Sequence, residues 1–375
     1  MQFETDQLIF SPRDVDPAWL PIGRHLGEPT HVLGAFNPAL TRLPNDNLLL
    51  MVRVAEALQV PEQGGKIRAI RWTTEQGYVL DEYPTEEIDT SDPRVYRLKK
   101  FEHAPVLSLT SVSWLLPVEL SPDGLQVLDV HYEKLIQPRT TYQEYGVEDP
   151  RITRIGERYY MTTCSVSSER LCTTLYTSDN GLDWTLEGII LDHQNKDMLL
   201  FPERIGDLYY ALTRPMGSVY FAPPPDRPTF PGPTISLAQS PDLLHWKPTD
   251  HPFLRPQLGS LISERLGGGT PPLKTPQGWL MLFHGVERRG LVGIYRTFWA
   301  MLDANDPHHF LHLEPQPLLE ARPELTADQT EGIYLTDVVF STGIAPHNDV
   351  LVVASGELDL CCRITHIPQS YFELT

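Results

Sequence analysis

Short apolar runs recur along the chain, each opened by a polar turn such as Asp46-Asn47 or Gly206-Asp207. The five runs cover residues 48–53, 158–164, 208–214, 279–284 and 350–355. Runs of this length between turn residues are typical of buried strands. Beyond the N-terminal third, no stretch keeps apolar residues at helical spacing over several turns, and 35 prolines would interrupt long helices. The pattern therefore predicts an all-β chain.

The five runs lie about 50 to 100 residues apart, which is the spacing of a repeat built from similar sheets. A second element repeats with them, because residues 178–184 and 240–246 each run from a serine through a polar turn to a tryptophan. Each of these segments is predicted to form an outer-strand hairpin. We predict one domain over residues 1–375, a five-bladed β-propeller with a central funnel that holds the active site. An insertion around residues 58–120 would widen the first gap, and a pair of β-sandwiches is the alternative.

Composition and charge argue against several classes of function. The formal net charge is −19, from 49 acidic and 30 basic residues, which opposes nucleic-acid binding. No apolar run approaches the length of a membrane span, and the N-terminus does not resemble a secretion signal. Four cysteines, two of them adjacent, and the absence of CxxC or HExxH spacing argue against disulfides and structural zinc. We expect a soluble, cytoplasmic protein without a metal site.

Candidate chemistry lies at the ends of the apolar runs. Four of them end in groups that can act on a ligand: Arg53, Arg214, His284, and Ser355 just before Glu357. If the runs are the innermost strands of the blades, these ends meet in one pocket. The alternative for each is a solvated strand end.

The segment Glu148-Asp149-Pro150-Arg151 is a second candidate. Asp149 precedes a proline, which restricts its backbone to extended conformations. Arg151 is near enough in sequence to pair with a carboxylate and lower its pKa. A surface turn with an ion pair is the alternative on the local sequence.

At these residues the chain resembles family 130 of the glycoside hydrolases, the mannoside phosphorylases and β-mannosidases, whose members are five-bladed propellers. The similar segments are 36–39, 51–56, 146–152, 195–205, 213–215, 268–272, 283–286, 295–296 and 337–343. The resemblance implies that Asp149 is the general acid, which protonates the glycosidic oxygen through a hydroxyl of the mannosyl unit. It further implies binding residues for the mannosyl unit and for phosphate. The mannosyl set is Asn37, Arg53, Asp359 and Phe340, and the phosphate set is Lys196, Arg214, His284 and Tyr295.

The two activities of that family make opposite demands on the site. An inverting hydrolase needs a second carboxylate to activate water. A phosphorylase needs cations there, because a carboxylate about 4 Å from phosphate would cost on the order of 4 kcal/mol per charge pair at an effective dielectric of 20. Lys196, Arg214 and His284 therefore favour phosphate. Departures from the family pattern, such as Glu357 beside the sugar site, leave Glu264 or Glu357 as a base and a hydrolase as the alternative.

The resulting hypothesis is an inverting phosphorylase that cleaves β-mannosides with inorganic phosphate and releases α-mannose 1-phosphate. The alternatives are an inverting β-mannosidase and a non-catalytic propeller that binds glycans. The expected partners are a mannose-containing oligosaccharide and phosphate as co-substrate, with no metal or organic cofactor. Residues 68–101 either cap the acceptor side or form a subunit contact in a homo-oligomer. The linkage, β-1,2 or β-1,4, stays open.

Overall fold

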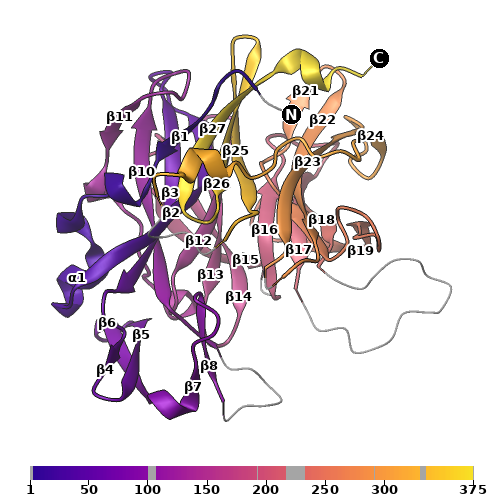
Figure 1. The fold of residues 1–375 in the computed structure, drawn as a ribbon. Coiled ribbons are helices and arrows are strands. Elements are labelled where there is room, and N and C mark those ends of the chain that lie inside the picture. Colours follow the sequence, from indigo (N-terminus) through magenta and orange to yellow (C-terminus); the bar gives the residue numbers. More distant parts are fainter. Residues whose placement is uncertain are drawn as a thin grey trace, which may run out of the picture.

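The computed structural model describes residues 3–99, 107–191, 193–216, 233–290, 292–329 and 335–374. It confirms an all-β chain, as Figure 1 shows. Within these residues the α-helix α1 (Pro21–Leu26) has six residues, and none of the helices is long and apolar enough to cross a membrane. The remaining helical segments are 3₁₀ turns at Pro12–Asp14, Pro17–Trp19, Thr85–Glu87, Tyr132–Lys134, Thr141–Gln143, Pro323–Thr326 and Gln369–Phe372.

Most strands belong to five antiparallel sheets. Four of them follow the chain in order from one edge strand, and the fifth is completed by the N-terminal strand. The first contains β2 (Thr30–Arg42), β3 (Leu48–Leu58), β10 (Ser111–Leu120) and β11 (Val127–Val130). The second contains β12 (Val147–Ile155), β13 (Arg158–Val166), β14 (Leu171–Ser178) and β15 (Thr185–Leu191). The third contains β16 (Asn195–Leu200), β17 (Tyr209–Pro215), β18 (Ile235–Ser240) and β19 (Lys247–Leu254). The fourth contains β20 (Arg265–Gly268), β21 (Leu273–Thr275), β22 (Gly278–Glu287), β23 (Ile294–Leu302) and β24 (Phe310–Leu313). The fifth contains β25 (Val339–His347), β26 (Val350–Glu357), β27 (Cys361–Pro368) and β1 (Asp6–Phe10).

The five apolar runs are strands, but they are not at the inner edges of their sheets. They lie in β3, β13, β17, β22 and β26, each the second strand of its sheet. The prediction that they are the innermost strands is therefore wrong. The physical reason is that both faces of these strands are buried, which makes the run continuously apolar. In β3, for example, Leu48, Leu50 and Val52 pack toward the fifth sheet, whereas Leu49 and Met51 pack toward the second.

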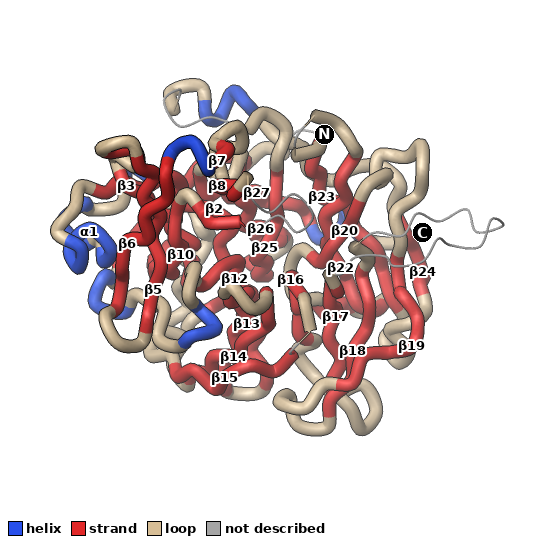
Figure 2. Tube along the Cα trace, turned by 90° about the horizontal axis from the view of Figure 1, so that it is seen from below, coloured by secondary structure: helices blue, strands red, loops and turns tan. Residues whose placement is uncertain are grey.

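Hydrophobic cores lie between successive sheets all the way around the molecule. Separate clusters join the first sheet to the second, the second to the third, the third to the fourth and the fourth to the fifth. A further cluster joins the fifth sheet back to the first. The edge strands agree, because β2 contacts both β12 and β25, and β16 contacts both β12 and β20. In Figure 2, β12, β16 and β25 accordingly lie around the middle of the molecule.

The two predicted hairpins connect the third and fourth strands of their sheets, as expected. Both are built by the same hydrogen bonds, in which a serine hydroxyl accepts from the backbone three residues later: Gly181 N to Ser178 Oγ and Leu243 N to Ser240 Oγ. In both turns this third residue has a left-handed backbone, with φ of 82° at Gly181 and 70° at Leu243. The repeated sequence therefore marks a repeated turn.

Two small sheets interrupt the first sheet between β3 and β10. They contain β4 (Glu62–Gln63), β5 (Lys66–Thr73) and β6 (Gly77–Pro84), and β7 (Ile88–Asp89), β8 (Val95–Leu98) and β9 (Leu107–Leu109). They share a core of their own that includes Ile67, Ile88 and Tyr96. We call residues 62–109 the insertion. It ends earlier than the expected range of 58–120, because residues 111–120 form β10 of the first sheet.

The N-terminal strand completes the last sheet through a buried ion cluster. Strand β1 pairs antiparallel with β27, and Asp6 accepts hydrogen bonds from Arg363 at 2.6 and 2.7 Å. Arg363 also donates to Glu357 at 2.9 Å. Glu357 is fully buried in this cluster. The expectation that Glu357 places a carboxylate beside the sugar site is therefore wrong, since its side chain neutralises Arg363.

Removal of the Asp6 charge should destabilise the pairing of β1 with β27. Burial raises the pKa of Asp6, but hydrogen bonds and charge attraction from Arg363 outweigh it and leave the pKa below its ordinary value. The ionised carboxylate thus stabilises the fold at neutral pH, and this contribution is lost as the pH falls below about 4. We expect Asp6→Asn to lower the free energy of unfolding at pH 7 by about 2 kcal/mol, since Arg363 keeps a second partner.

Urea denaturation at pH 7 and pH 3.5 measures this difference. The matched control is Asp46→Asn, which removes the exposed partner of Arg42 and should change stability little. An Asp6→Asn variant as stable as the Asp46→Asn control at pH 7 would show that the N-terminal strand is not held by this pair.

Candidate active site

Each of four edge strands is interrupted by a bulge that turns a polar side chain toward the neighbouring sheets. The pairing register shifts at Asn37 in β2, Asp149 in β12, Asp197 in β16 and Thr342 in β25. Asn37, Asp149 and Asp197 have left-handed backbones, with φ of 48°, 49° and 52°. The expectation that Pro150 holds Asp149 in an extended conformation is therefore wrong. Asn and Asp tolerate this conformation better than other non-glycine residues, and bulges commonly re-aim side chains beside active sites. The bulges therefore explain why polar residues occupy these positions.

The second strand of three of the sheets adds a polar residue opposite the edge strand. In the ladders, Arg53 lies opposite Phe36, Arg214 lies opposite Lys196, and His284 lies opposite Gly267. The polar groups at the ends of these apolar runs thus lie in the same region, although the runs are not the inner strands. Ser355 differs, because its hydroxyl bonds to Ser341 inside the fifth sheet.

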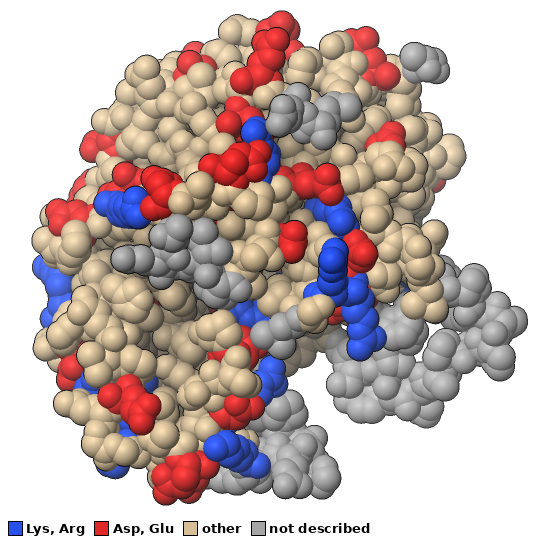
Figure 3. All heavy atoms as spheres, viewed as in Figure 1, with Lys and Arg blue, Asp and Glu red and all other residues tan. Residues whose placement is uncertain are grey.

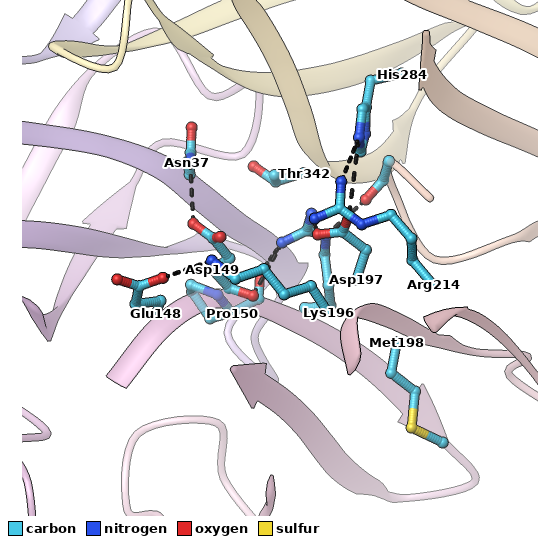
Figure 4. Close-up of polar contacts among 12 residues, drawn as sticks. Asn37, Glu148, Asp149, Pro150, Lys196, Asp197, Met198, Arg214, His284 and Thr342 are labelled. Carbon is cyan, nitrogen blue, oxygen red and sulfur yellow. Dashed lines mark hydrogen bonds and ion pairs between the residues drawn. The ribbon is translucent and has the colours of Figure 1, made fainter. Parts of the chain in front are cut away.

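Asp149 lies in a hydrogen-bonded group that spans three sheets. Its Oδ1 accepts from Asn37 Nδ2 at 3.0 Å and from Arg53 Nη1 at 2.8 Å. Glu148 bridges Arg53 Nη2 at 2.8 Å and Lys196 Nζ at 3.0 Å. Figure 4 shows Asn37, Glu148, Asp149 and Lys196 close together. We call Asn37, Arg53, Glu148, Asp149 and Lys196 the acid group.

A second set of charges is centred on Asp197. Its carboxylate lies 3.5 Å from Arg151 Nη2 and 3.1 Å from Arg214 Nε, and Arg214 Nη1 lies 3.2 Å from His284 Nε2 (Figure 4). A guanidinium N–H can only donate, so Nε2 of His284 is the acceptor and its ring proton is on Nδ1. We call Arg151, Asp197, Arg214 and His284 the Asp197 group.

The ion pair of Arg151 differs from the one expected. Arg151 donates to the backbone oxygen of Asp149 at 2.9 Å, but its carboxylate partner is Asp197. The reason is the left-handed bulge, which turns the Asp149 side chain toward Asn37 and Arg53. Arg151 is almost fully buried and also donates to Gly269 O at 2.6 Å. It therefore ties the second sheet to the third and fourth.

Aromatic rings lie beside the Asp197 group. The ring of Phe340 lies 4.6 Å from that of His284, centroid to centroid, and 5.3 Å from the Arg151 guanidinium carbon. The ring of Tyr295 lies 5.8 Å from His284, and its hydroxyl accepts from Arg265 at 2.8 Å. Phe340 and Tyr295, expected in the sugar and phosphate sites, thus both adjoin His284. His284 is fully buried, and its ring contacts Arg214.

The charges around Asp149 favour its ionised form. Burial raises its pKa, but attraction to Arg53, Lys196 and Arg151 and the hydrogen bond from Asn37 outweigh burial, so the pKa lies well below its ordinary value. Burial and the nearby Arg214 likewise hold the pKa of His284 well below its ordinary value, which agrees with a neutral ring. Figure 3 shows acidic residues spread over the surface with basic ones mostly beside them, so the concentration of cations at the site is a local feature.

Asp359 has the opposite shift. It lies in the turn between β26 and β27 with a left-handed backbone (φ 52°). Burial raises its pKa to about 6, although Arg53 opposes this shift. Asp359 therefore ionises in a pH range where most carboxylates are already ionised.

Three residues of the site were missed in the sequence: Glu148, Asp197 and Arg265. The Asn37-Pro38 and Asp149-Pro150 pairs share an Asx-Pro signal that could have revealed the bulges, but Asp197 is followed by methionine. Glu148 and Arg265 act by pairing with other site residues, which only the fold reveals. Glu264, considered as a base, is ion-paired with Arg265.

Comparison with known proteins places the chain in a family. The model of glycoside hydrolase family 130, described as beta-1,4-mannooligosaccharide phosphorylase, matches residues 110–372. A beta-1,2-mannobiose phosphorylase from Listeria innocua is 32% identical over 374 residues, which cover 96% of this chain and 93% of the relative. A 1,2-beta-oligomannan phosphorylase from Thermoanaerobacter sp. is 35% identical over 64% of this chain and 74% of its own length. The chain belongs to glycoside hydrolase family 130.

A solved structure agrees with this assignment. The beta-1,2-mannobiose phosphorylase from Listeria innocua, solved with beta-1,2-mannobiose, superposes with a TM-score of 0.81 at 31% identity. The superposition covers 97% of this chain and 95% of that one.

The raised pKa of Asp359 gives a stability prediction. A carboxyl whose pKa is higher in the folded than in the unfolded protein binds its proton more tightly when folded. Stability therefore falls as the pH rises from the unfolded pKa of about 4 to the folded pKa of about 6, and it stays low above that pH. Asn carries no charge and tolerates a left-handed backbone. We expect Asp359→Asn to melt a few degrees higher than the unchanged protein at pH 8 and at nearly the same temperature at pH 3.5, below the unfolded pKa.

Calorimetric or circular-dichroism melts at the two pH values check this difference. Asp349→Asn, in the exposed turn before β26, is the control and should melt like the unchanged protein at both. A lower melting temperature for Asp359→Asn at pH 8 would contradict the burial of an uncompensated charge.

Proposed function

We propose that the protein is an inverting β-mannoside phosphorylase, which cleaves a mannosidic bond with inorganic phosphate and releases α-mannose 1-phosphate. We further infer that its five sheets are the blades of a closed propeller whose funnel holds the site. The ring of hydrophobic cores between successive sheets supports the closed arrangement. Asp149 is the general acid, and Asn37, Arg53 and Asp359 hold the mannosyl unit.

The observation that carries the proposal is the pair of cations beside Asp149. Lys196 and Arg214 lie directly opposite each other in the β16–β17 ladder. Lys196 reaches the acid group through Glu148, and Arg214 is fixed by Asp197 and His284. Two cations held side by side next to a carboxylic acid suit an attacking phosphate, which they bind through charge-assisted hydrogen bonds. The ring of Tyr295 adjoins that of His284 and belongs to the proposed phosphate site.

The carboxylates of the region argue against the hydrolase. An inverting hydrolase needs a carboxylate that faces a water molecule below the sugar ring. Glu148 is paired with Arg53 and Lys196, and Asp197 with Arg151 and Arg214. Glu264 and Glu357, the two bases considered, are each paired with an arginine. Every one of these carboxylates is thus engaged by a cation.

The low pKa of Asp149 gives phosphate a second role. A general acid must carry a proton, yet Arg53, Lys196 and Arg151 favour its ionised form. A phosphate anion between Lys196 and Arg214 would offset this positive charge and raise the pKa of Asp149. Bound phosphate therefore helps to keep Asp149 protonated. The proton then passes through a sugar hydroxyl to the glycosidic oxygen.

The substrate is proposed to be β-1,2-linked. Both relatives described above act on 1,2-linked mannosides by their names, and the Listeria innocua enzyme is similar along nearly the whole chain. The family description names β-1,4-linked oligosaccharides instead. The assignment of the linkage is therefore based on the relatives alone, whereas the assignment of the reaction class is also based on the geometry of the site.

Reverse phosphorolysis tests the reaction. We expect the purified protein to release phosphate from α-mannose 1-phosphate in the presence of mannose and to form a β-1,2-mannobiose. Asp149→Asn, which cannot donate the proton, should lose at least about 10³-fold in rate. Asp46→Asn is the control and should retain full activity.

Two results would contradict the phosphorylase. Liberation of mannose from β-mannobiose at the same rate with and without phosphate would indicate the hydrolase. Binding of mannosides without turnover, unchanged in Asp149→Asn, would indicate a glycan-binding protein.

Substitution of Lys196 tests the phosphate site. We expect Lys196→Gln to raise the KM for phosphate in phosphorolysis roughly 10- to 100-fold, because one charge-assisted hydrogen bond is lost. The KM for the mannobiose should change much less. Lys134→Gln, which removes a surface lysine paired with Asp183, should leave both values unchanged. A larger effect on mannobiose than on phosphate would move Lys196 to the sugar site.

A further inference from the structure

The insertion extends from the first sheet to loops of the fourth and fifth sheets. Pro93 and Arg94, between β7 and β8, line one side of a pocket of about 240 Å³. The other side is formed by the segments 289–290 and 292–294, which precede β23, and 335–338, which precede β25. The pocket is therefore built by parts of the chain that are far apart in sequence.

The pocket wall is connected to both halves of the candidate site. Tyr295 N donates to Asp337 O at 2.9 Å, and Leu358 N, next to Asp359, donates to Val338 O at 2.8 Å. One short segment thus links the phosphate side, through Tyr295, to the sugar side, through Asp359. Arg94 is also close enough to Asp359 to lower its pKa by charge attraction. These contacts connect the pocket wall to residues on both sides of the candidate site.

Arg94 is held in a fixed orientation. Its Nε and Nη2 donate to the two oxygens of Asp92 at 3.0 and 2.8 Å. Its backbone is fixed as well, because Thr110 N donates to Arg94 O at 3.2 Å and Thr110 Oγ1 donates to Pro93 O at 2.9 Å. Asp92 is buried, whereas the Arg94 side chain is 35% exposed. A planar donor group is therefore presented to the pocket on a rigid support.

The charges of the pocket favour a neutral ligand with hydroxyl groups. Arg94 is neutralised by Asp92, and Arg289 shares the pocket lining with Asp337. Two cations and two carboxylates offer both donors and acceptors, which suits hydroxyls, since each hydroxyl donates and accepts. An anion would meet carboxylates as well as guanidinium groups. The volume is suited to a single sugar ring rather than to a long chain.

We propose that this pocket binds the sugar ring on the leaving-group side of the cleaved bond, and that Arg94 is a specificity-determining residue for this acceptor. The inference rests on the proposed phosphorylase function. It assigns the insertion the role of capping the acceptor side. The acceptor class is a neutral hexose such as mannose, whose hydroxyls accept hydrogen bonds from Arg94.

Initial rates of phosphate release from α-mannose 1-phosphate, with mannose as the varied acceptor, test the proposal. We expect Arg94→Ala to raise the KM for mannose about tenfold, with the KM for α-mannose 1-phosphate unchanged within about twofold. Arg94→Lys keeps a charge beside Asp92 but loses the planar fork, so it should raise the KM for mannose to an intermediate value. Arg97→Ala is the matched control, because Arg97 is on the same insertion, 3.9 Å from Asp92, and does not line the pocket.

A binding measurement separates this inference from the reaction itself. Mannose is titrated calorimetrically into Asp149→Asn protein saturated with α-mannose 1-phosphate, with and without Arg94→Ala. A dissociation constant about tenfold weaker in the double variant supports the acceptor pocket even if the unchanged protein shows no turnover, a result that would overturn only the proposed reaction. Equal mannose affinities, equal rises of both KM values, or an Arg97→Ala effect as large as that of Arg94→Ala would each overturn the role of Arg94.

Discussion

The bulges of the edge strands are the constraint on which the site depends. A regular strand would alternate its side chains between the two neighbouring sheets, and all of them would enter the hydrophobic cores. A left-handed residue at Asn37, Asp149 and Asp197 breaks this alternation and turns a polar side chain out of the core. Asn and Asp are the residues that adopt this backbone at the lowest cost without being glycine, and they also carry the required chemistry. Backbone geometry and site chemistry thus select the same residue types.

Placing several cations in one buried region creates a second constraint. Arg53, Lys196, Arg151 and Arg214 would repel each other, and each would lose hydration on burial. Glu148 and Asp197 resolve both problems, because each lies between two cations. The carboxylates therefore hold the cations in place before phosphate arrives. They also offset part of the positive charge, so that an incoming anion binds by exchanging partners within a fixed arrangement.

Much of the fold and part of the site could be predicted from the sequence. Residues 48–53 and the other apolar runs identify strands, because a strand buried on both faces shows no alternation. For the same reason the runs could not show their place in the sheet, and we assigned them wrongly to the inner edge. Arg53, Arg214 and Asp149 were found from strand ends and a motif. Asp197 and Glu148 were not, because they pair with residues of other sheets. Glu357 was misplaced because the ion cluster that holds it includes Asp6 of the N-terminal strand, which is distant in sequence.

The two sides of the site are built on supports of different rigidity, and this difference bears on how specificity can change. The acid group and the Asp197 group are held by edge strands that contact each other around the whole molecule, so a shift in one would disturb several sheets. The proposed acceptor pocket is bounded by an insertion with its own small core and by loops. Substitutions there can alter the acceptor without loss of the ring of cores. A fixed donor and phosphate side combined with a replaceable acceptor side would allow one fold to serve different linkages.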